Sequence, residues 1–178
     1  MVIKSIIQAM FFILSTPINI YWRLTYSIFR SKFSVSQGFK FNGHHILFYG
    51  DGSITCGSGS YIGDGSTVHA ASGYEVVIGE GCHISSNVRI FTQTAIADAD
   101  FSAKPVPSRF GNVFVGNYCW IGANVLINPG VSIGDNVVIG ANSVVCKDVP
   151  AGQIWGGVPA RYIRTKNKYN PNGGVLDV

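Results

Sequence analysis

A period of six residues organises most of this 178-residue chain. From Val115 onward the sequence reads VGNYCW, IGANVL, INPGVS, IGDNVV, IGANSV and VCKDVP without a break, and the same pattern occurs at residues 56–67 and 78–95. The first position of these eleven hexads is aliphatic in ten, and the second is glycine in seven. A sandwich would give alternating strands at irregular intervals, so a strict short period indicates stacked, repeating units.

Period six predicts three short strands in each coil of about eighteen residues, which is a triangular prism. The aliphatic first position is expected to fill the interior, and the small or branched fifth position, which includes Cys82 and Cys119, to face inward beside it. Glycine and asparagine are expected at the corners, where positive φ is needed. We therefore predict an all-β fold, a left-handed parallel β-helix of hexapeptide repeats over residues 56–150. Its 22 glycines and its charged fraction of only 12% agree with this fold.

The remaining segments are assigned by what interrupts the repeat. Residues 34–55 are predicted to form a lead-in segment, and residues 151–178 a C-terminal cofactor-binding segment and tail. Residues 96–114 depart from the repeat and are expected to form an excursion loop. Loops of this length in a compact repeat are more often functional than not.

Residues 1–33 are apolar and basic, with four cations and no acid. Thr16 is suited to be an N-cap and Pro17 a first helical residue, so two short helices are expected. No signal-peptide cleavage site follows the apolar run. Three interpretations stay open: peripheral contact with an anionic membrane surface, packing on a neighbouring subunit, or a membrane span.

Charge and cysteine content exclude several classes of function. The net charge is only +4 and the cations gather near the two ends, including Arg161, Arg164, Lys166 and Lys168, so nucleic-acid binding is disfavoured. The four cysteines form no CxxC pair, which argues against a zinc knuckle or a thioredoxin-like motif. Free thiols suit a reducing cytoplasm, and a cytoplasmic protein is expected, at the inner face of the membrane if residues 1–33 bind there.

Three stretches resemble the hexapeptide-repeat acyltransferases of the galactoside, maltose and polysaccharide O-acetyltransferase type. They are NVRIFTQT at 87–94, CWIGANVLINPGVSIGDNVVIGANSVVCKDVP at 119–150 and GGVPARYIR at 156–164. The resemblance implies a homotrimer that binds acetyl-CoA in the groove between neighbouring subunits. The first 33 residues also resemble the leaders of some glycan O-acetyltransferases.

The resemblance further implies a set of cofactor contacts. Two lie along the groove and five near its C-terminal end: Trp120, Ala123, Ala141, Cys146, Lys147, Arg161 and Arg164. A nucleotide diphosphate needs cations, which agrees with the last three of these residues. The alternatives are a surface aromatic that covers a corner, for Trp120, and a solvated tail, for the cations.

The family's catalytic base is a histidine that takes the proton of the acceptor hydroxyl, and the aligned residue here is Ala95. Alanine cannot transfer a proton. Three explanations stay open. The histidine was replaced on purpose to trap a bound complex, or the natural protein has lost its catalytic base and only binds or has a structural role, or another histidine acts as the base. The candidates are His69 and His83, and the repeat places His83 one coil from Trp120, about 4.8 Å away. Nothing catalytic is expected of His44 and His45.

Other acceptor-side residues are weaker candidates. The resemblance assigns Asn87 to the catalytic site, but Asn87, Asn124 and Asn142 share the fourth hexad position, so a structural asparagine ladder is an equal alternative. Near Ala95 the candidate acceptor contacts are Tyr74, Arg89, Asp98 and Asp100.

The leading prediction is an acetyl-CoA-dependent O-acetyltransferase that acts on a sugar of a bacterial surface polysaccharide or its precursor, and that Ala95 impairs. The alternatives are N-acetylation of an amino-sugar nucleotide, acetylation of a drug, or a non-catalytic CoA-binding trimer. A metal-dependent hydratase would need three converging histidines, so no metal site is predicted.

Overall fold

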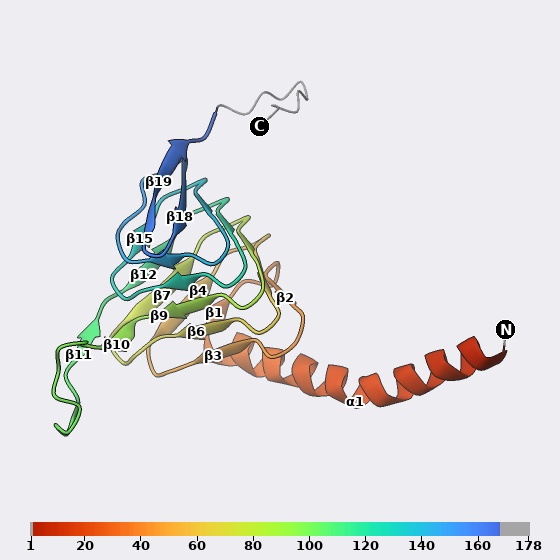
Figure 1. Cartoon of the computed structure of the whole chain (residues 1–178). Helices are drawn as coiled ribbons and strands as arrows, with labels where there is room; N and C mark the ends of the chain where they lie inside the picture. Colours follow the sequence, from red (N-terminus) through yellow and green to blue (C-terminus); the bar gives the residue numbers. More distant parts are fainter. Residues whose placement is uncertain (1, 168–178) are drawn as a thin grey trace.

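The computed structural model describes the backbone of residues 2–167 and the side chains of residues 16–167. Short parallel strands stack into a triangular prism, and one helix lies across its N-terminal end (Figure 1). Three sheets form the sides of the prism, which we call faces A, B and C in the order in which the chain visits them. The predicted prism is confirmed.

Each face takes one strand from each coil. Face A contains β1 (Ser34–Val35), β4 (Ser53–Cys56), β7 (Glu75–Ile78), β12 (Val113–Val115) and β15 (Ser132–Ile133). Face B contains β2 (Lys40–Asn42), β5 (Tyr61–Gly63), β8 (His83–Ile84), β13 (Trp120–Ile121), β16 (Val138–Ile139), β18 (Gln153–Gly157) and β19 (Ala160–Thr165). Face C contains β3 (Leu47–Tyr49), β6 (Thr67–His69), β9 (Arg89–Phe91), β14 (Leu126–Ile127) and β17 (Val144–Val145).

The hexad positions point as the repeat predicts. The first-position residues Ile121, Ile127 and Ile139 are fully buried, as are the fifth-position residues Cys82 and Cys119 to within 1%. These residues stack along the prism axis, so the inward apolar side chains of each coil pack against those of the next coil. Thr94 is a fifth-position residue that was expected inside but is exposed, because the chain has already left the prism after the buried Thr92.

The prism begins earlier than the hexads suggested. Residues 34–55, expected to be a lead-in, already supply β1, β2, β3 and β4 to the three faces. Phe39 and Phe48 fill the interior of this first coil, where later coils use isoleucine and valine. One side of the first coil packs against the helix and the other against the second coil, so larger side chains replace the regular pattern at the helix.

The excursion is shorter than the predicted 96–114. Residues Gln93–Ala95 (β10) pair antiparallel with Ser108–Phe110 (β11), and β12 is already a strand of face A. The loop proper therefore lies between β10 and β11 and hangs from the vertex where faces C and A meet (Figure 1). The six-residue period alone does not distinguish a strand that joins a face of the prism from a strand, such as β10, that pairs with the segment returning from the loop.

The prediction of two short N-terminal helices is wrong. The chain forms one helix, α1 (Val2–Lys32), with Pro17 inside it. Proline removes one backbone donor from the helix, but the hydrogen bonds on either side of it continue, and α1 bends along its length without breaking (Figure 1). Within residues 2–167 no helix has a stretch long and apolar enough to cross a membrane.

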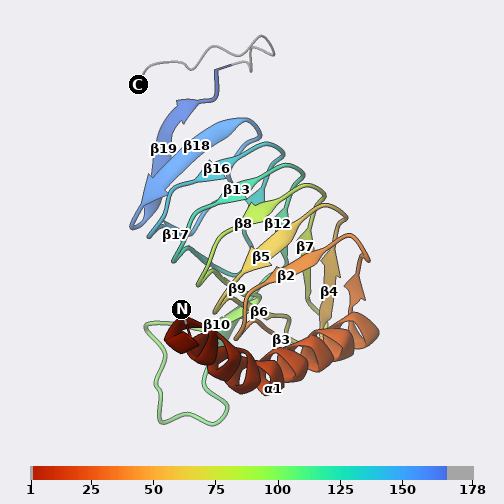
Figure 2. The ribbon, with the colours of Figure 1, turned by 90° about the vertical axis from the view of Figure 1, so that its right-hand side faces the viewer.

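Aromatic packing holds α1 against the first coil. The Tyr26 ring stacks on Phe41 with centroids 4.4 Å apart, and the Phe29 ring stacks on Phe48 at 5.8 Å. Trp22 is buried between the same helix and the prism. The C-terminal half of α1 thus closes the open end of the prism beside β2 and β3 (Figure 2).

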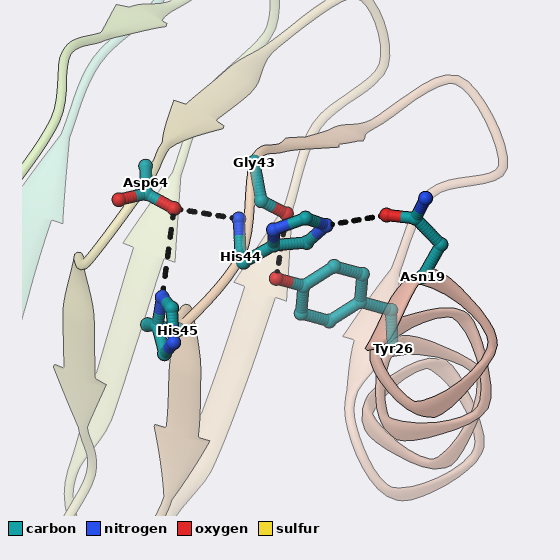
Figure 3. A network of polar contacts seen from close by, with 6 residues as sticks. All are labelled: Asn19, Tyr26, Gly43, His44, His45 and Asp64. Atoms are coloured by element: carbon teal, nitrogen blue, oxygen red, sulfur yellow. Dashed lines mark hydrogen bonds and ion pairs between the residues drawn. The ribbon is translucent and has the colours of Figure 1, made fainter. Parts of the chain in front are cut away.

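A polar clamp fixes the rotation of the helix (Figure 3). Asn19 Oδ1 lies 2.8 Å from His44 Nε2, and the Tyr26 hydroxyl donates to the Gly43 carbonyl at 2.9 Å. The backbone N–H of His44 donates in turn to Asp64 Oδ1 at 2.7 Å. His44 therefore has a structural role, and α1 has one defined orientation on the prism.

Candidate active site

Face B carries an outward column of ring side chains. Tyr61, His83 and Trp120 occupy the same register on β5, β8 and β13. The Tyr61 and His83 ring centroids lie 5.0 Å apart, and Trp120 is 58% exposed. The prediction that His83 lies one coil from Trp120 is confirmed. The column gives face B an exposed apolar platform with one imidazole beside it.

The vertex between faces B and C is built on an asparagine ladder. Asn87, Asn124 and Asn142 have φ values of 57°, 60° and 59°. The Asn87 amide donates to Asn124 at 2.8 Å, and the Asn124 amide donates to Asn142 at 2.9 Å. The structural alternative for Asn87 therefore accounts for its side chain. Ala123 and Ala141 precede two of the asparagines, and their small side chains leave this edge of face B unobstructed.

The last two strands that the structure describes form a hairpin on face B. Strands β18 and β19 pair antiparallel, and β18 continues the sheet beside β16. Arg161 and Arg164 on β19 are exposed and donate to the neighbouring backbone carbonyls of Ala160 and Thr165, at 3.1 Å and 3.3 Å. Among residues 16–167 no carboxylate forms an ion pair with either guanidinium. Lys166 donates to Asn136 Oδ1, and Lys168 lies outside the described residues.

The vertex between faces C and A carries the other half of the predicted site. Ala95 is exposed on β10 opposite Ser108. Asp98 and Asp100 lie in the exposed loop that follows. Hydrogen bonds from the Ser102 hydroxyl (2.7 Å) and backbone N–H (2.8 Å) to Asp100 hold the pKa of that carboxyl below its usual value. Asp100 is therefore held in its charged form, and the Ala95 side chain has no group that can accept a proton.

Cys146 and Lys147 also lie at the C/A vertex. Both are exposed, and the Asn128 amide donates to Cys146 Sγ at 3.2 Å. The predicted cofactor residues are therefore split. Trp120, Ala123, Ala141, Arg161 and Arg164 lie on face B or its edge with face C, and the other two lie on the vertex across the prism.

A polar hollow of about 450 Å³ lies beside the excursion on the C/A vertex. It is lined by Asp51, Gly52, Ser53, Gly73, Tyr74, Glu75 and Asn112. The Tyr74 ring stacks on Phe110, with centroids 5.2 Å apart and planes at 17°. Sequence reasoning identified Tyr74 but missed Asp51, Glu75 and Asn112, which come from three successive coils. The register of β4 with β7 pairs Ser53 with Glu75, and the Glu75 backbone N–H donates to Asn112 Oδ1 at 3.1 Å, which brings these turns together. Arg89 lies elsewhere, exposed on face C between Thr67 and Leu126.

His69 and three of the four cysteines are at least partly shielded from solvent. His69 packs on the Tyr49 ring at 4.7 Å, and burial lowers its pKa, which favours the neutral form. Burial raises the pKa of the Cys56 thiol, and of the four cysteines only Cys146 is exposed. Within the described part of the chain no three histidine, cysteine, aspartate or glutamate side chains group as metal ligands.

In a triangular section, face B lies opposite the vertex shared by faces C and A. The Trp120 column and the excursion with Ala95 consequently sit on opposite sides of one chain. A single chain cannot bring both sets of residues to one ligand. Two chains placed side by side can, with face B of one against the C/A vertex of the other.

Comparison with known proteins agrees with this architecture. The profile described as "Bacterial transferase hexapeptide (six repeats)" matches residues 112–147. The solved structure of a galactoside acetyltransferase in complex with coenzyme A superposes with a TM-score of 0.68 at 32% identity, over 80% of this chain and 70% of that one.

Two curated relatives are also similar in sequence. The galactoside O-acetyltransferase of Escherichia coli is 42% identical over 53% of this chain and 46% of its own length. The putative lipopolysaccharide biosynthesis O-acetyl transferase WbbJ of E. coli is 37% identical over 58% of this chain and 55% of its own length. The chain thus spans about half the length of the curated relatives it matches.

The predicted left-handed β-helix is confirmed. The same assignment follows from the repeat, from the three parallel faces and from the superposition over most of both chains. The chain belongs to the hexapeptide-repeat transferase family.

Proposed function

We propose that this protein is an acetyl-CoA-dependent O-acetyltransferase that acts on a sugar of a bacterial surface polysaccharide or of its precursor. The observation that supports it most is the arrangement of face B, where an exposed tryptophan shares one sheet with two exposed arginines that form no ion pair within residues 16–167. The names of the relatives, which act on galactosides and in lipopolysaccharide biosynthesis, support a sugar acceptor.

The residues present fit coenzyme A. Trp120 offers a flat apolar surface for a pantetheine arm, and Ala123 and Ala141 leave the edge beside it open. Arg161 and Arg164 supply two guanidiniums for nucleotide phosphates, and no carboxylate among the described residues neutralises their charges. Lys147 and Cys146 complete the set only from a second chain, because they lie across the prism.

A homotrimer is proposed to complete the divided site. Each cofactor groove would combine face B of one subunit with the C/A vertex of the next, and three such contacts close a ring. The excursion of the second subunit would then reach the end of the groove near Trp120. The polar hollow with Tyr74, Asp51 and Glu75 is proposed to hold acceptor hydroxyls there, since carboxylates accept hydrogen bonds from vicinal hydroxyl groups.

Bound acetyl-CoA would supply the acetyl group as a thioester. The protein has to orient the acceptor hydroxyl toward it, exclude water and take the hydroxyl proton. Ala95 cannot take a proton, so in this chain the remaining candidate beside Trp120 is His83. His83 is exposed on the platform, whereas His69 lies on face C, against Tyr49.

Ala95 also favours a second candidate function, a trimer that binds CoA without transferring its acetyl group. Both candidates predict a cytoplasmic protein, because acetyl-CoA is made and used there and the chain has four free cysteines.

Mass spectrometry of acetylated product, with acetyl-CoA and a panel of oligosaccharide acceptors, separates the two functions. Product from the unchanged chain supports the transferase. CoA binding without product from either the unchanged chain or Ala95→His supports the binding protein. Absence of CoA binding would contradict both.

A further inference from the structure

The side of α1 that faces away from the prism is apolar and uncovered. Ile20, Tyr21, Leu24 and Ile28 are exposed by 52%, 61%, 62% and 64%. Their spacing of three and four residues places them on one side of the helix, opposite the aromatic residues that pack on the first coil. We call these four residues the outer strip. Exposed apolar residues gathered in this way mark an interaction surface.

The outer strip points along the axis of the prism and away from its body. Helix α1 lies across the end of the prism (Figures 1 and 2), and the clamp of Asn19, Tyr26 and His44 fixes its rotation (Figure 3). Subunits that stand side by side, as in the proposed trimer, would leave the strip uncovered. They would also place three outer strips at the same end, a step that rests on the proposed function.

Among the helix side chains that the structure describes, the charged residues beside the outer strip are all cations. Arg23 and Lys32 lie at its two sides, and the first acid of the whole chain is Asp51. Lys32 Nζ donates to the Gly50 carbonyl at 2.8 Å and lies 5.2 Å from the Phe33 ring, so its charge is held at the junction of helix and prism. A basic rim around an apolar strip is complementary to a surface that is negatively charged outside and apolar inside.

A hollow of about 270 Å³ opens on one flank of the strip. It is lined by Arg23, Tyr26, Ser27, Arg30 and Phe41. The Arg30 guanidinium donates to the Ser36 and Phe39 carbonyls and lies 5.4 Å from the centroid of the Phe41 ring. Arg30 is thereby fixed in place beside the exposed Arg23. Two guanidiniums and a serine hydroxyl suit a phosphate group, which guanidinium binds well.

We propose that the outer strip and its basic rim dock the protein on a membrane surface that contains anionic phospholipid. The apolar side chains enter the boundary between head groups and acyl chains, and Tyr21 lies at the level of the head groups. The arginines reach the lipid phosphates, one of them in the hollow. Docking in this orientation stands the prism upright on the membrane and presents the proposed active site to lipid-linked acceptors.

The test is flotation of the full chain with phosphatidylcholine vesicles, with and without phosphatidylglycerol. Binding is expected only to the anionic vesicles. Leu24→Ser with Ile28→Ser should reduce the bound fraction at least about tenfold, because two apolar side chains no longer enter the interface. Val158→Ser with Ile163→Ser removes two equally exposed aliphatic residues at the far end of the prism and should leave binding unchanged. Arg23→Glu should weaken binding, and added salt should reproduce its effect.

Three results would overturn the proposal. They are no flotation of the unchanged chain with anionic vesicles, equal flotation of the Leu24/Ile28 variant, and a change of molecular mass of that variant in light scattering, which would make the strip a subunit contact. Circular dichroism confirms that each variant is folded. The assay contains neither CoA nor sugar, so its result does not depend on the proposed enzymatic activity.

Discussion

The double substitution Arg161→Ala with Arg164→Ala tests the cofactor site most directly. Both guanidiniums are exposed, donate only to adjacent carbonyls and have no carboxylate partner within the described residues. Their removal costs the folded protein little and takes away two charges from the end of face B. If both meet nucleotide phosphates, CoA must bind less tightly.

The expected magnitude follows from their exposure. A hydrogen bond to a charged group contributes about 1.5–3 kcal/mol, but solvent screening reduces exposed pairs to about 1 kcal/mol each. The double variant should therefore lose about 2 kcal/mol of binding free energy, which is about a thirtyfold higher Kd. The loss should shrink as salt is added, because the screening length falls.

Isothermal titration calorimetry with CoA measures this change. Pantetheine, which lacks the nucleotide phosphates, should bind the variant and the unchanged chain equally well. Lys104→Ala with Arg109→Ala removes the same charge from the excursion and should leave CoA binding unaltered. Equal CoA affinity of the unchanged chain and the Arg161/Arg164 variant would refute the reasoning and make both arginines part of a solvated tail.

The other predictions concern catalysis, assembly and the corners of the prism. Ala95→His should raise turnover about 10²–10⁴-fold. The gained activity should be lost at acid pH, because the new imidazole is protonated near its usual pKa of about 6.5. If His83→Gln abolishes the activity of the unchanged chain and Ala95→His adds nothing, His83 is the base. Light scattering should give three times the chain mass, and a stable monomer at micromolar concentration would contradict the shared groove. Asn124→Ala should lower the free energy of unfolding in urea by about 1–2 kcal/mol, because alanine is strained at φ 60°, and Asn124→Gly should lower it less; equal losses would assign the effect to the hydrogen bonds of the ladder.

The period of six predicted the prism because the constraint behind it is local and repeated. Each coil must place an aliphatic side chain such as Ile121 inward and a residue tolerant of positive φ, such as Asn124, at the corner. The same logic predicted that His83 and Trp120 are neighbours, since residues with equal positions in successive coils stack. It failed for residues 34–55, because the first coil packs Phe39 and Phe48 against a helix and so departs from the repeat.

The candidate site was only partly predictable. Motif resemblance selected Trp120, Arg161 and Lys147 as one set, but motif order carries no information about which vertex each residue occupies. The hollow at Tyr74 was missed because its other walls, Asp51 and Asn112, belong to different coils and to turns outside the repeat. The asparagine ladder was foreseen as one of two alternatives, and only the side-chain hydrogen bonds distinguish a ladder from a free amide.

The sequence by itself determined the architecture, since burial in a stacked coil restricts the same hexad positions in every turn and leaves a visible period. Tertiary structure alone decided the length of the excursion, the continuity of α1 through Pro17 and the separation of the Trp120 face from the Ala95 vertex. These features depend on which segments meet in space. Strand β10 pairs with β11, the segment that returns from the loop. Helix α1 is held by aromatic contacts with the first coil. The triangular section of the prism places face B opposite the C/A vertex.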